Sequence, residues 1–433
     1  MLRQKSPSGD LGVKNKNSMN KRIIYIILLL FVTIAGLWGI PELVKTATSS
    51  KSHYPFVYFS SVKKKLMFRE SDGRKNPFHD DEGTVYTDDE YDKSLPLFNF
   101  RQLTVNGEMP DSIDGIAIDP RELRVKMVNF RYAPAEIHRP ETGLYIMYES
   151  LPKKAKLESP GDVFRMKDKI EFIDDETNTL NQKKSELFQS ALLKAGYTFP
   201  AQWTYGDLNI RKPYDEGYFS LDAKDELYHI KMVNGRPFVK NTQLDSTIKP
   251  AYFSMLEVAD KRFYGFLFDK KGNVYIIEEA GGKYNPVQLG IDPVNLDTDD
   301  LMILGNMLYW TVSVQNESGK RVYALGAQTL ERVRDTFIAA SPDKWDVVAG
   351  KIFPFYLTFQ KKTNDYVVPQ INFTAYLALF CNFALALLIA FLISGKSKKQ
   401  KIFSGIYTLV FGIAGAVALL IVPAPTPNPL KGA

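Results

Sequence analysis

Three long apolar runs near the two ends of the chain constrain its fold more than any other feature. Residues 23–40, 371–393 and 402–422 carry no charged side chain, and the polar stretch 41–370 separates the first run from the second. An α-helix rises about 1.5 Å per residue, so about 20 apolar residues cross the roughly 30 Å hydrocarbon core of a bilayer. The sequence therefore predicts three transmembrane helices over these ranges, with one large domain between the first and the second.

The basic residues indicate how these helices are oriented. Residues 1–22 hold six Lys or Arg against one Asp, and residues 394–401 hold four Lys and no acidic residue. Because Lys and Arg accumulate in cytoplasmic segments, both stretches are expected in the cytoplasm. The domain at 41–370 and the Pro-rich tail at 423–433 are then extracytoplasmic. This predicts a multi-pass protein of the inner (cytoplasmic) membrane with a large periplasmic domain.

The same distribution explains the basic balance of the chain. The formal net charge is +6, and the two basic segments contribute more than that, so the remainder is slightly acidic. A nucleic-acid footprint is not needed to account for this balance. We expect the lipid bilayer, and no nucleic acid, as a partner.

A cleaved signal peptide is the alternative interpretation of the first apolar run. Thr46-Ala47 is a tolerable small-residue cleavage site. The basic lead is long, however, and the apolar run exceeds the usual length of about 7 to 15 residues, which favours a retained anchor. Cleavage would leave the same placement of the large domain.

Cys381 is the single cysteine of the chain and lies inside the second apolar run. The large domain therefore cannot form a disulfide, and its stability must come from packing and hydrogen bonds. Cys-based zinc sites and Cys nucleophiles are excluded from it as well.

Short aromatic and β-branched runs dominate the large domain. Clusters of Gly, Asp, Asn and Pro separate such runs at 56–59, 123–132, 143–148, 218–221 and 263–268. This alternation predicts antiparallel strands joined by turns. The expected fold class is a mainly β extracytoplasmic domain, either propeller-like or another antiparallel sheet arrangement, with one amphipathic helix, plus three transmembrane α-helices.

One turn pattern recurs, in which an acidic or Gly turn is followed by an aliphatic residue and Tyr. It occurs at 80–86, 222–228 and 269–275, and more loosely at 317–323. Asp and Gly supply the backbone angles of a tight turn, and Val-Tyr suits the strand that leaves it. The spacing of these units is what suggests the blades of a propeller.

Residues 179–195 predict the helix of the large domain. Leu187 and Ala191 lie at helical spacing, and Gly196 follows at a favoured C′ position. The acidic triplet 174–176 comes just before this range, where negative charge suits the helix dipole.

No catalytic signature is present in the sequence. The four histidines show no paired-ligand spacing, and GxSxG, Walker A and GxGxxG sequences do not occur. We therefore expect no catalytic residue, no metal ligand set and no cofactor. His229 alternates with apolar residues and is expected to pack on a strand or face water instead of binding copper.

An acidic stretch is the candidate for a calcium loop. It consists of Asp292, Asp297, Asp299 and Asp300. The stretch lacks the Gly and the terminal bidentate Glu of an EF-hand, so a solvated turn is the favoured interpretation.

The last two apolar runs are joined by a short loop and are expected to form a helical hairpin. Gly412 and Ala416 lie four residues apart in the last run, which gives one face small residues that let helices approach closely. Asn382 lies in the middle of the second run, where a buried amide needs a partner. Helix packing is therefore expected at these three positions.

Several stretches in order carry a family resemblance over roughly residues 55–330, at 95–97, 101–103, 110–115, 163–165, 171–174, 184–185, 199–201 and 212–219. Together they resemble a domain-of-unknown-function family of membrane proteins from Bacteroides-type bacteria. The most specific stretch is Asp215, Glu216, Gly217, Tyr218 and Phe219. The resemblance implies an association with ABC-type ATPase and permease subunits, in some members with multi-copper enzyme maturation, and it transfers no catalytic residue.

These observations lead to a membrane-anchored, non-catalytic accessory or permease-associated component of an ABC-type transport or maturation system. Its extracytoplasmic domain would bind a ligand or partner. The alternative is a membrane-anchored extracytoplasmic hydrolase with Asp215 and Glu216 as its first carboxylate pair, although neighbours on a strand face opposite ways. A third possibility, a signalling sensor, would need a partner because the cytoplasmic segments hold no output domain.

Overall fold

A computed structural model describes residues 9–49, 54–70, 77–154, 156–341, 343–360, 366–392 and 397–422, with side chains from residue 22 onward. The chain divides into two compact units, each described separately below. The helical unit comprises residues 1–52, 341–362 and 366–433, and the β unit comprises residues 53–340 and 363–365. The large domain was expected to extend to residue 370, so its boundary lies about thirty residues earlier than predicted.

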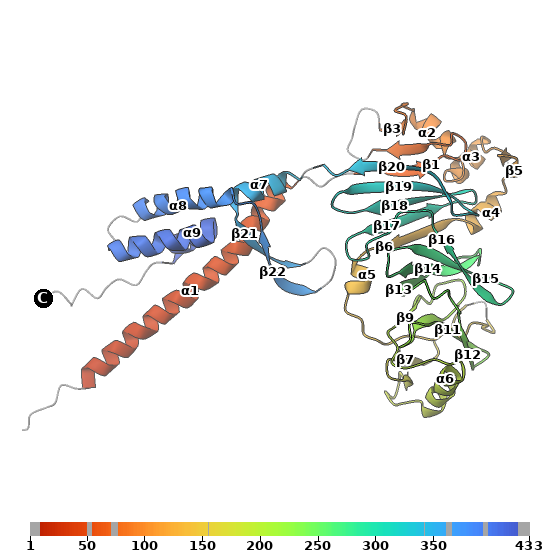
Figure 1. The fold of residues 1–433 in the computed structure, drawn as a ribbon, viewed down its shortest axis with the longest axis horizontal. Coiled ribbons are helices and arrows are strands. Elements are labelled where there is room, and N and C mark those ends of the chain that lie inside the picture. The colour runs from red at the N-terminus through yellow and green to blue at the C-terminus, as the bar shows by residue number, and fades with distance from the viewer. Residues whose placement is uncertain are drawn as a thin grey trace, which may run out of the picture. The chain divides into compact units, whose positions relative to one another are not determined.

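The β unit is built around three antiparallel sheets, each made largely of strands that follow one another in the chain (Figure 1). The first sheet contains β9 (Trp203–Gly206), β10 (Tyr218–Leu221), β11 (Leu227–Val233) and β12 (Arg236–Asn241). The second contains β13 (Pro250–Met255), β14 (Phe263–Asp269), β15 (Val274–Ala280) and β16 (Lys283–Gln288). The third contains β17 (Asp300–Gly305), β18 (Tyr309–Gln315), β19 (Gly319–Gly326) and β20 (Arg332–Ala339), and β6 (Val128–Tyr132) extends it beside β17.

Smaller elements complete this unit. One three-stranded sheet contains β1 (Phe56–Phe59), β2 (Leu66–Arg69) and β3 (Phe78–Asp80). Two hairpins pair β4 (Ser112–Ile113) with β5 (Ile116–Ala117) and β7 (Asp162–Met166) with β8 (Ile170–Asp174). The helices of the unit are α2 (Asp88–Ser94), α3 (Phe100–Asn106), α4 (Pro120–Val125), α5 (Ala135–His138) and α6 (Gln182–Lys194).

Four hydrophobic clusters join these layers into a row. The first cluster joins β7, β8 and α6 to the first sheet. The second lies between the first and second sheets, and the third lies between the second and third sheets. The fourth joins β1 and β2 to the third sheet. None of the clusters among the described residues links the two ends of the row, so the architecture is an open stack of antiparallel sheets and not a closed ring (Figure 1).

The recurring acidic turn has one geometry at three places. The side chains of Asp80, Asp222 and Asp269 are buried at the ends of strands. In each case Oδ1 accepts hydrogen bonds from the backbone N–H groups two and four residues later. A carboxylate that binds the turn backbone in this way replaces water as its partner, which is why Asp recurs at these positions.

The expected single helix of this unit is α6, which is shorter than predicted. Asn181 caps its N-terminus by accepting from the N–H of Lys184, and Gly196 follows its end with a φ of +93°. The acidic triplet is not at the helix start, because Asp174 ends β8 and binds the turn residue Thr177. Since α2 to α5 also occur, the β unit contains more helices than the one predicted.

The helical unit contains α1 (Gly9–Thr48), α7 (Lys344–Ile352), α8 (Ala378–Leu392) and α9 (Lys398–Ile421), with the hairpin β21 (Phe355–Gln360) and β22 (Val367–Phe373). Among the residues that the structure describes, two helices are long and apolar enough to cross a membrane, at Arg22–Thr48 within α1 and at α9. The prediction of three such helices is therefore corrected to two. The helix expected over 371–393 begins only at Ala378, because residues 371–373 belong to β22, and its 15 residues span only about 22 Å.

Other expected boundaries also differ. The first apolar run, predicted as a helix over 23–40, is part of a helix that includes residues 9–22 and continues past Pro41 to Thr48. Residues 41–48, which were expected at the start of the large domain, are therefore helical. Residues 398–401 of the expected Lys loop form the first turn of α9. Residues 1–8 of the basic tail, 394–396 of the loop and the whole tail at 423–433 lie outside the described residues.

Candidate functional site

The segment singled out in the sequence, Asp215 to Phe219, lies in the connection before β10 and in β10 itself. Asp215 is not on a strand: it forms a buried ionic cluster with Lys212 and Glu257, whose side chains are at most 2% exposed. Lys212 Nζ lies 2.5 Å from Asp215 Oδ1 and 2.7 Å from Glu257 Oε2. It also donates to the carbonyl oxygen of Asp207 at 2.7 Å. A lysine of the same connecting segment therefore neutralises the acidic residue that stood out in the sequence.

Two carboxylates share this one ammonium, so the cluster has an excess of negative charge when both are ionised. Burial raises the pKa of Glu257 to about 7, and it raises the pKa of Asp215 as well, although Lys212 opposes both changes. Burial works to lower the pKa of Lys212, and the two carboxylates outweigh it, so that pKa is raised. A charge without an equal opposite charge is unfavourable in a buried site, and Glu257 is the group that relieves it by taking up a proton.

The remaining residues of the segment have structural contacts. Glu216 pairs with Lys231 at 2.5 Å, away from the cluster, while its backbone N–H donates to Glu257 Oε1 at 2.5 Å. Gly217 has a φ of +72°, and a Cβ there would collide with the carbonyl oxygen of Ile230. Asp215 and Glu216 therefore pair with two different lysines. They do not form an acid–base pair open to a substrate.

Tyr218 and Phe219 are fully buried in β10. Tyr218 donates its hydroxyl hydrogen to the carbonyl oxygen of Ile146 at 2.5 Å. The ring of Phe219 stacks on His229 with a centroid distance of 4.7 Å. The ring nitrogens of His229 lie 2.7 Å from the Tyr284 hydroxyl and 2.5 Å from the Glu216 carbonyl oxygen. His229 therefore packs inside the sheet with both nitrogens engaged, and burial lowers its pKa to about 3.

The acidic stretch is dispersed. Asp292 pairs with Arg321 and Arg332, and Asp297 contacts His138. Asp299 is buried and accepts hydrogen bonds from its own turn. No group of three or more His, Cys, Asp or Glu side chains arranged to hold a metal ion occurs among the residues that the structure describes.

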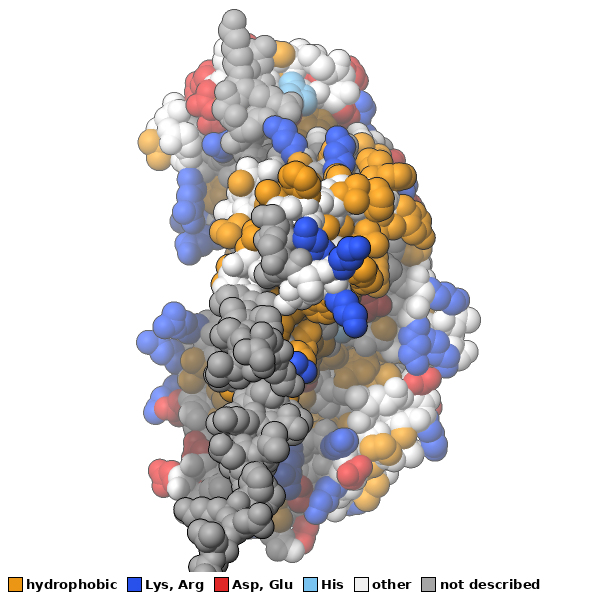
Figure 2. All heavy atoms as spheres, turned by 90° about the vertical axis from the view of Figure 1, so that its left-hand side faces the viewer, with side chains coloured by type: hydrophobic (Ala, Val, Ile, Leu, Met, Phe, Trp, Pro, Cys, Tyr) orange, Lys and Arg blue, Asp and Glu red, His pale blue; other side chains and the backbone are white. Residues whose placement is uncertain are grey.

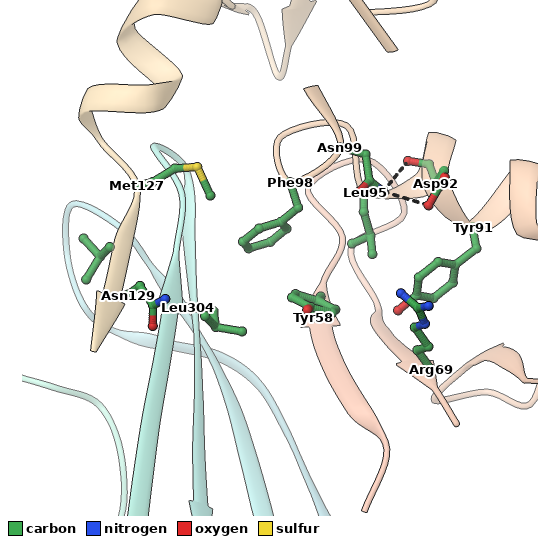
Figure 3. A pocket seen from close by; sticks show the side chains of 11 residues that line it. Tyr58, Arg69, Tyr91, Asp92, Leu95, Phe98, Asn99, Met127, Asn129 and Leu304 are labelled. Carbon is green, nitrogen blue, oxygen red and sulfur yellow. Dashed lines mark hydrogen bonds between the residues drawn. The ribbon is translucent and has the colours of Figure 1, made fainter. Parts of the chain in front are cut away.

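A hollow of about 280 Å³ lies on the β unit, and no sequence signal pointed to it. Its lining comes from residues far apart in the chain: Tyr58, Arg69, Tyr91, Asp92, Leu95, Phe98, Asn99, Met127, Val128, Asn129 and Leu304. Figure 3 shows Tyr58 and Phe98 on one side of the space, facing Met127, Asn129 and Leu304 on the other.

The third sheet supplies the floor of the hollow. Asn129 of β6 and Leu304 of β17 are direct cross-strand partners, and the alternation along β6 buries Phe130 and Tyr132 on the opposite face. The wall comes from β1, β2 and the α2–α3 segment. The capping box of α2, formed by Thr87 and Glu90, fixes the start of the helix that carries Tyr91.

The predicted helix-packing residues come together in the helical unit. Asn382 of α8 is 1% exposed and donates from Nδ2 to the carbonyl oxygen of Leu409 in α9 at 3.1 Å. Gly412 interrupts α9 with a φ of 57°, and a Cβ there would lie 2.6 Å from Asn382 Oδ1. Ala416 is buried in a cluster with Leu29 of α1. Figure 2 shows hydrophobic side chains gathered on the outer face of the end of this unit that holds α8 and α9.

A sequence-family profile described as a domain of unknown function, DUF4857, matches residues 56–325. The match covers more than half of the chain. The chain belongs to the DUF4857 family. The DUF4857 region begins with β1 and ends in β19, so it includes both the hollow and the Lys212 cluster and excludes the helical unit.

Comparisons beyond the DUF4857 profile give little more. Comparison with curated proteins gives no match. Among solved structures, the dihydro-heme d1 dehydrogenase NirN in complex with DHE is similar with 9% sequence identity and a TM-score of 0.21. That likeness covers 59% of this chain and 66% of the other, and at this TM-score it carries no argument about fold or function.

Proposed function

We propose that this protein is a membrane-anchored, non-catalytic accessory component of an ABC-type transport or maturation system. In this proposal the helical unit lies in the inner membrane and docks on a permease. The β unit lies outside the cytoplasm and binds a ligand or a partner.

The observation that carries the proposal is the packing of α1 against α9. A Cβ at Gly36 would lie 3.1 Å from the Cβ of Ala414, so the two helices are as close there as glycine allows. Thr33 Oγ1 lies 2.6 Å from the hydroxyl of Tyr407. Small residues and interhelical hydrogen bonds are the means by which helices associate within lipid. They support α1 as a retained part of a helix bundle and not as a removable signal peptide.

The outer faces of the same helices support contact with lipid or with another membrane protein. Phe31 of α1 is 69% exposed, and Phe380 and Phe391 of α8 are 74% and 80% exposed. Large aromatic side chains this exposed would be unfavourable in water, and a bilayer or a permease would cover them. Because α8 is short, a neighbouring helix of a partner would also relieve its mismatch with the bilayer.

The hydrolase alternative receives no support from the carboxylate pair that motivated it. Asp215 is enclosed with Lys212, and Glu216 faces Lys231. Glycoside hydrolysis needs two carboxyl groups that flank one open site. The binding role therefore fits the geometry better.

Co-purification of the full chain in a mild detergent tests this proposal. We expect an ATPase and a permease subunit to be recovered with it. Phe380→Ser and Phe391→Ser should reduce that recovery, while Val105→Ser, which changes an 83% exposed residue of the β unit, should not. Recovery of the chain alone, with the wild-type sequence and in several mild detergents, would count against the accessory role.

A further inference from the structure

We propose that the hollow bordered by Tyr58, Phe98 and Leu304 is a binding site for a small, flat organic anion. This deepens the ligand-binding role proposed above and rests on it. The ligand would lie with its flat body against the aromatic wall and its anionic group at Arg69.

The shape of the hollow sets the size and form of the ligand. Its volume of about 280 Å³ is just below the roughly 300–1,000 Å³ of sites for drug-sized molecules, which suits one or two rings. The rings of Tyr58 and Phe98 contact each other, with centroids 5.0 Å apart, and form one continuous wall. Met127 and Leu304 face this wall across the open space (Figure 3). A flat apolar body would contact aromatic rings on one side and flexible aliphatic groups on the other.

Arg69 supplies the positive charge. It is exposed at the hollow and has no carboxylate within ion-pair distance among the described residues; its guanidinium lies 6.0 Å from the centroid of the Phe78 ring. Arg69 also borders a second hollow, of about 500 Å³, which it shares with Tyr58. A guanidinium with free N–H groups at the edge of an apolar space can bind a carboxylate with two parallel hydrogen bonds.

Tyr91 supplies an independent observation. The residue is 4% exposed, it lines the hollow, and its hydroxyl has no hydrogen-bond partner among the described residues. A buried hydroxyl without a hydrogen-bond partner is unfavourable, and a ligand acceptor would relieve this. Burial raises the pKa of Tyr91, and the nearby charge of Arg69 opposes that change. The hydroxyl therefore stays protonated and lies near Arg69, where it could donate to an acceptor.

The one acidic residue of the hollow is already engaged. Asp92 Oδ1 accepts a hydrogen bond from Asn99 Nδ2 at 3.0 Å (Figure 3). Burial raises the pKa of Asp92, the neighbouring Asp88 adds to this, and Arg69 opposes it. The free donors at the hollow, Arg69 and Tyr91, favour an acceptor-only group.

Binding of 2-naphthoate to the full-length protein in detergent tests the proposal, with equilibrium dialysis as the measurement. We expect 2-naphthoate to bind wild type saturably. Neutral 2-naphthamide should bind wild type at least about tenfold more weakly, because it lacks the negative charge of the contact. 2-Naphthoate should bind Arg69→Gln at least about tenfold more weakly, because that variant lacks the positive charge. Tyr91→Phe should weaken binding about threefold to tenfold. Arg236→Gln, at an exposed position of β12 in another sheet, should leave binding unchanged.

The outcomes separate this proposal from the accessory role. Equal binding of naphthoate and naphthamide, binding that does not change in Arg69→Gln, or no binding at all would overturn the anion site. The melting temperature of Arg69→Gln should match wild type, because the exposed side chain makes no ion pair among the described residues, so a loss of binding would not reflect unfolding. Naphthoate binding without co-purified transporter subunits would overturn the accessory role and leave the site intact.

Discussion

The side-chain amide of Asn382 in α8 lies directly against Gly412 in α9, where a Cβ would come within 2.6 Å of its Oδ1. The same amide donates to the carbonyl oxygen of Leu409 at the interruption of α9. A polar backbone group exposed by a break in a helix needs a partner in an apolar surrounding. Asn382 supplies that partner, and only glycine leaves room for it.

Gly412→Ala should therefore destabilise the helical unit by about 2–4 kcal/mol, because it adds both a collision and backbone strain at a positive φ. Gly405→Ala in the same helix is the matched control. A Cβ at Gly405 would meet nothing closer than 3.9 Å, so that variant should be neutral or slightly more stable. Thermal unfolding in detergent measures both. Equal melting temperatures for the two variants would contradict the packing described.

Gly36→Ile should separate α1 from α9, because the Cβ of Ala414 already lies 3.1 Å from a Cβ placed at Gly36. Gly39→Ile adds the same volume three residues later, where a Cβ would meet nothing within 4 Å, and it should be tolerated. We expect a lower melting temperature, by roughly 5 °C or more, for the first variant alone.

The intact mass of the purified wild-type chain should include the N-terminal residues, because α1 packs against α9 as a retained helix. A mass that corresponds to a chain beginning near Ala47 would show that α1 is removed.

Local chemistry explains which features the sequence predicted. The acidic turns follow from residues within five positions of one another, and the carboxylate of Asp222 or Asp269 needs nothing else to bind its own turn. The end of α6 at Gly196 is equally local. Antiparallel sheets were expected from such signals, and the structure confirms them.

Features that depend on distant residues were missed. The hollow joins Tyr58 to Leu304 across most of the β unit, and no spacing along the chain records that proximity. The cluster at Asp215 could not be predicted because Glu257 comes from a separate segment. The error at 371–373 has another cause: one apolar run extends from β22 into α8, and apolar composition alone does not mark where the strand ends and the helix begins.

Glu257→Gln should change how stability depends on pH. Burial raises the pKa of Glu257 to about 7, above its ordinary value of 4.5, so the folded protein holds this proton more tightly than the unfolded chain. The stability that this group contributes is present at low pH and is lost as pH rises from about 4.5 to about 7. The melting temperature of wild type relative to Glu257→Gln should therefore fall between pH 5 and pH 8, by an amount equivalent to about 1–3 kcal/mol.

His229 acts in the opposite direction, which is why the comparison is made between variants. Burial lowers its pKa to about 3, so its contribution is present above about pH 6.5 and is lost as pH falls. That effect is common to wild type and to Glu257→Gln and cancels in the difference. Glu186→Gln, at an exposed position of α6, should leave the wild-type pH profile unchanged. A difference between wild type and Glu257→Gln that does not vary with pH would contradict the raised pKa of Glu257.

Asp269→Ala should be destabilising, by about 2–4 kcal/mol, because it removes a buried carboxylate and leaves the partly buried turn N–H groups that it binds without their acceptor. Asp269 is 2% exposed and accepts from the N–H groups of Lys271 and Asn273 at 2.8 and 2.9 Å. Asp297→Ala is the control, since its side chain is 71% exposed and its contact with His138 should contribute less than about 1 kcal/mol. Urea unfolding monitored by the circular dichroism of the β-sheets measures the free energy of unfolding of both variants. An equal loss of unfolding free energy in Asp269→Ala and Asp297→Ala would contradict a stabilising role for the Asp269 carboxylate in its turn.

The central claim is that the β unit lies outside the cytoplasm, held there by helices of the membrane. Single cysteines introduced as Ser246→Cys in the exposed loop before β13 and as Lys399→Cys at the start of α9, both in a Cys381→Ser background, test it most directly. With a membrane-impermeant maleimide on intact cells whose outer membrane has been permeabilised, we expect Ser246→Cys to be labelled at once and Lys399→Cys only after lysis. Labelling of Lys399→Cys on intact cells, with Ser246→Cys protected until lysis, would contradict the account.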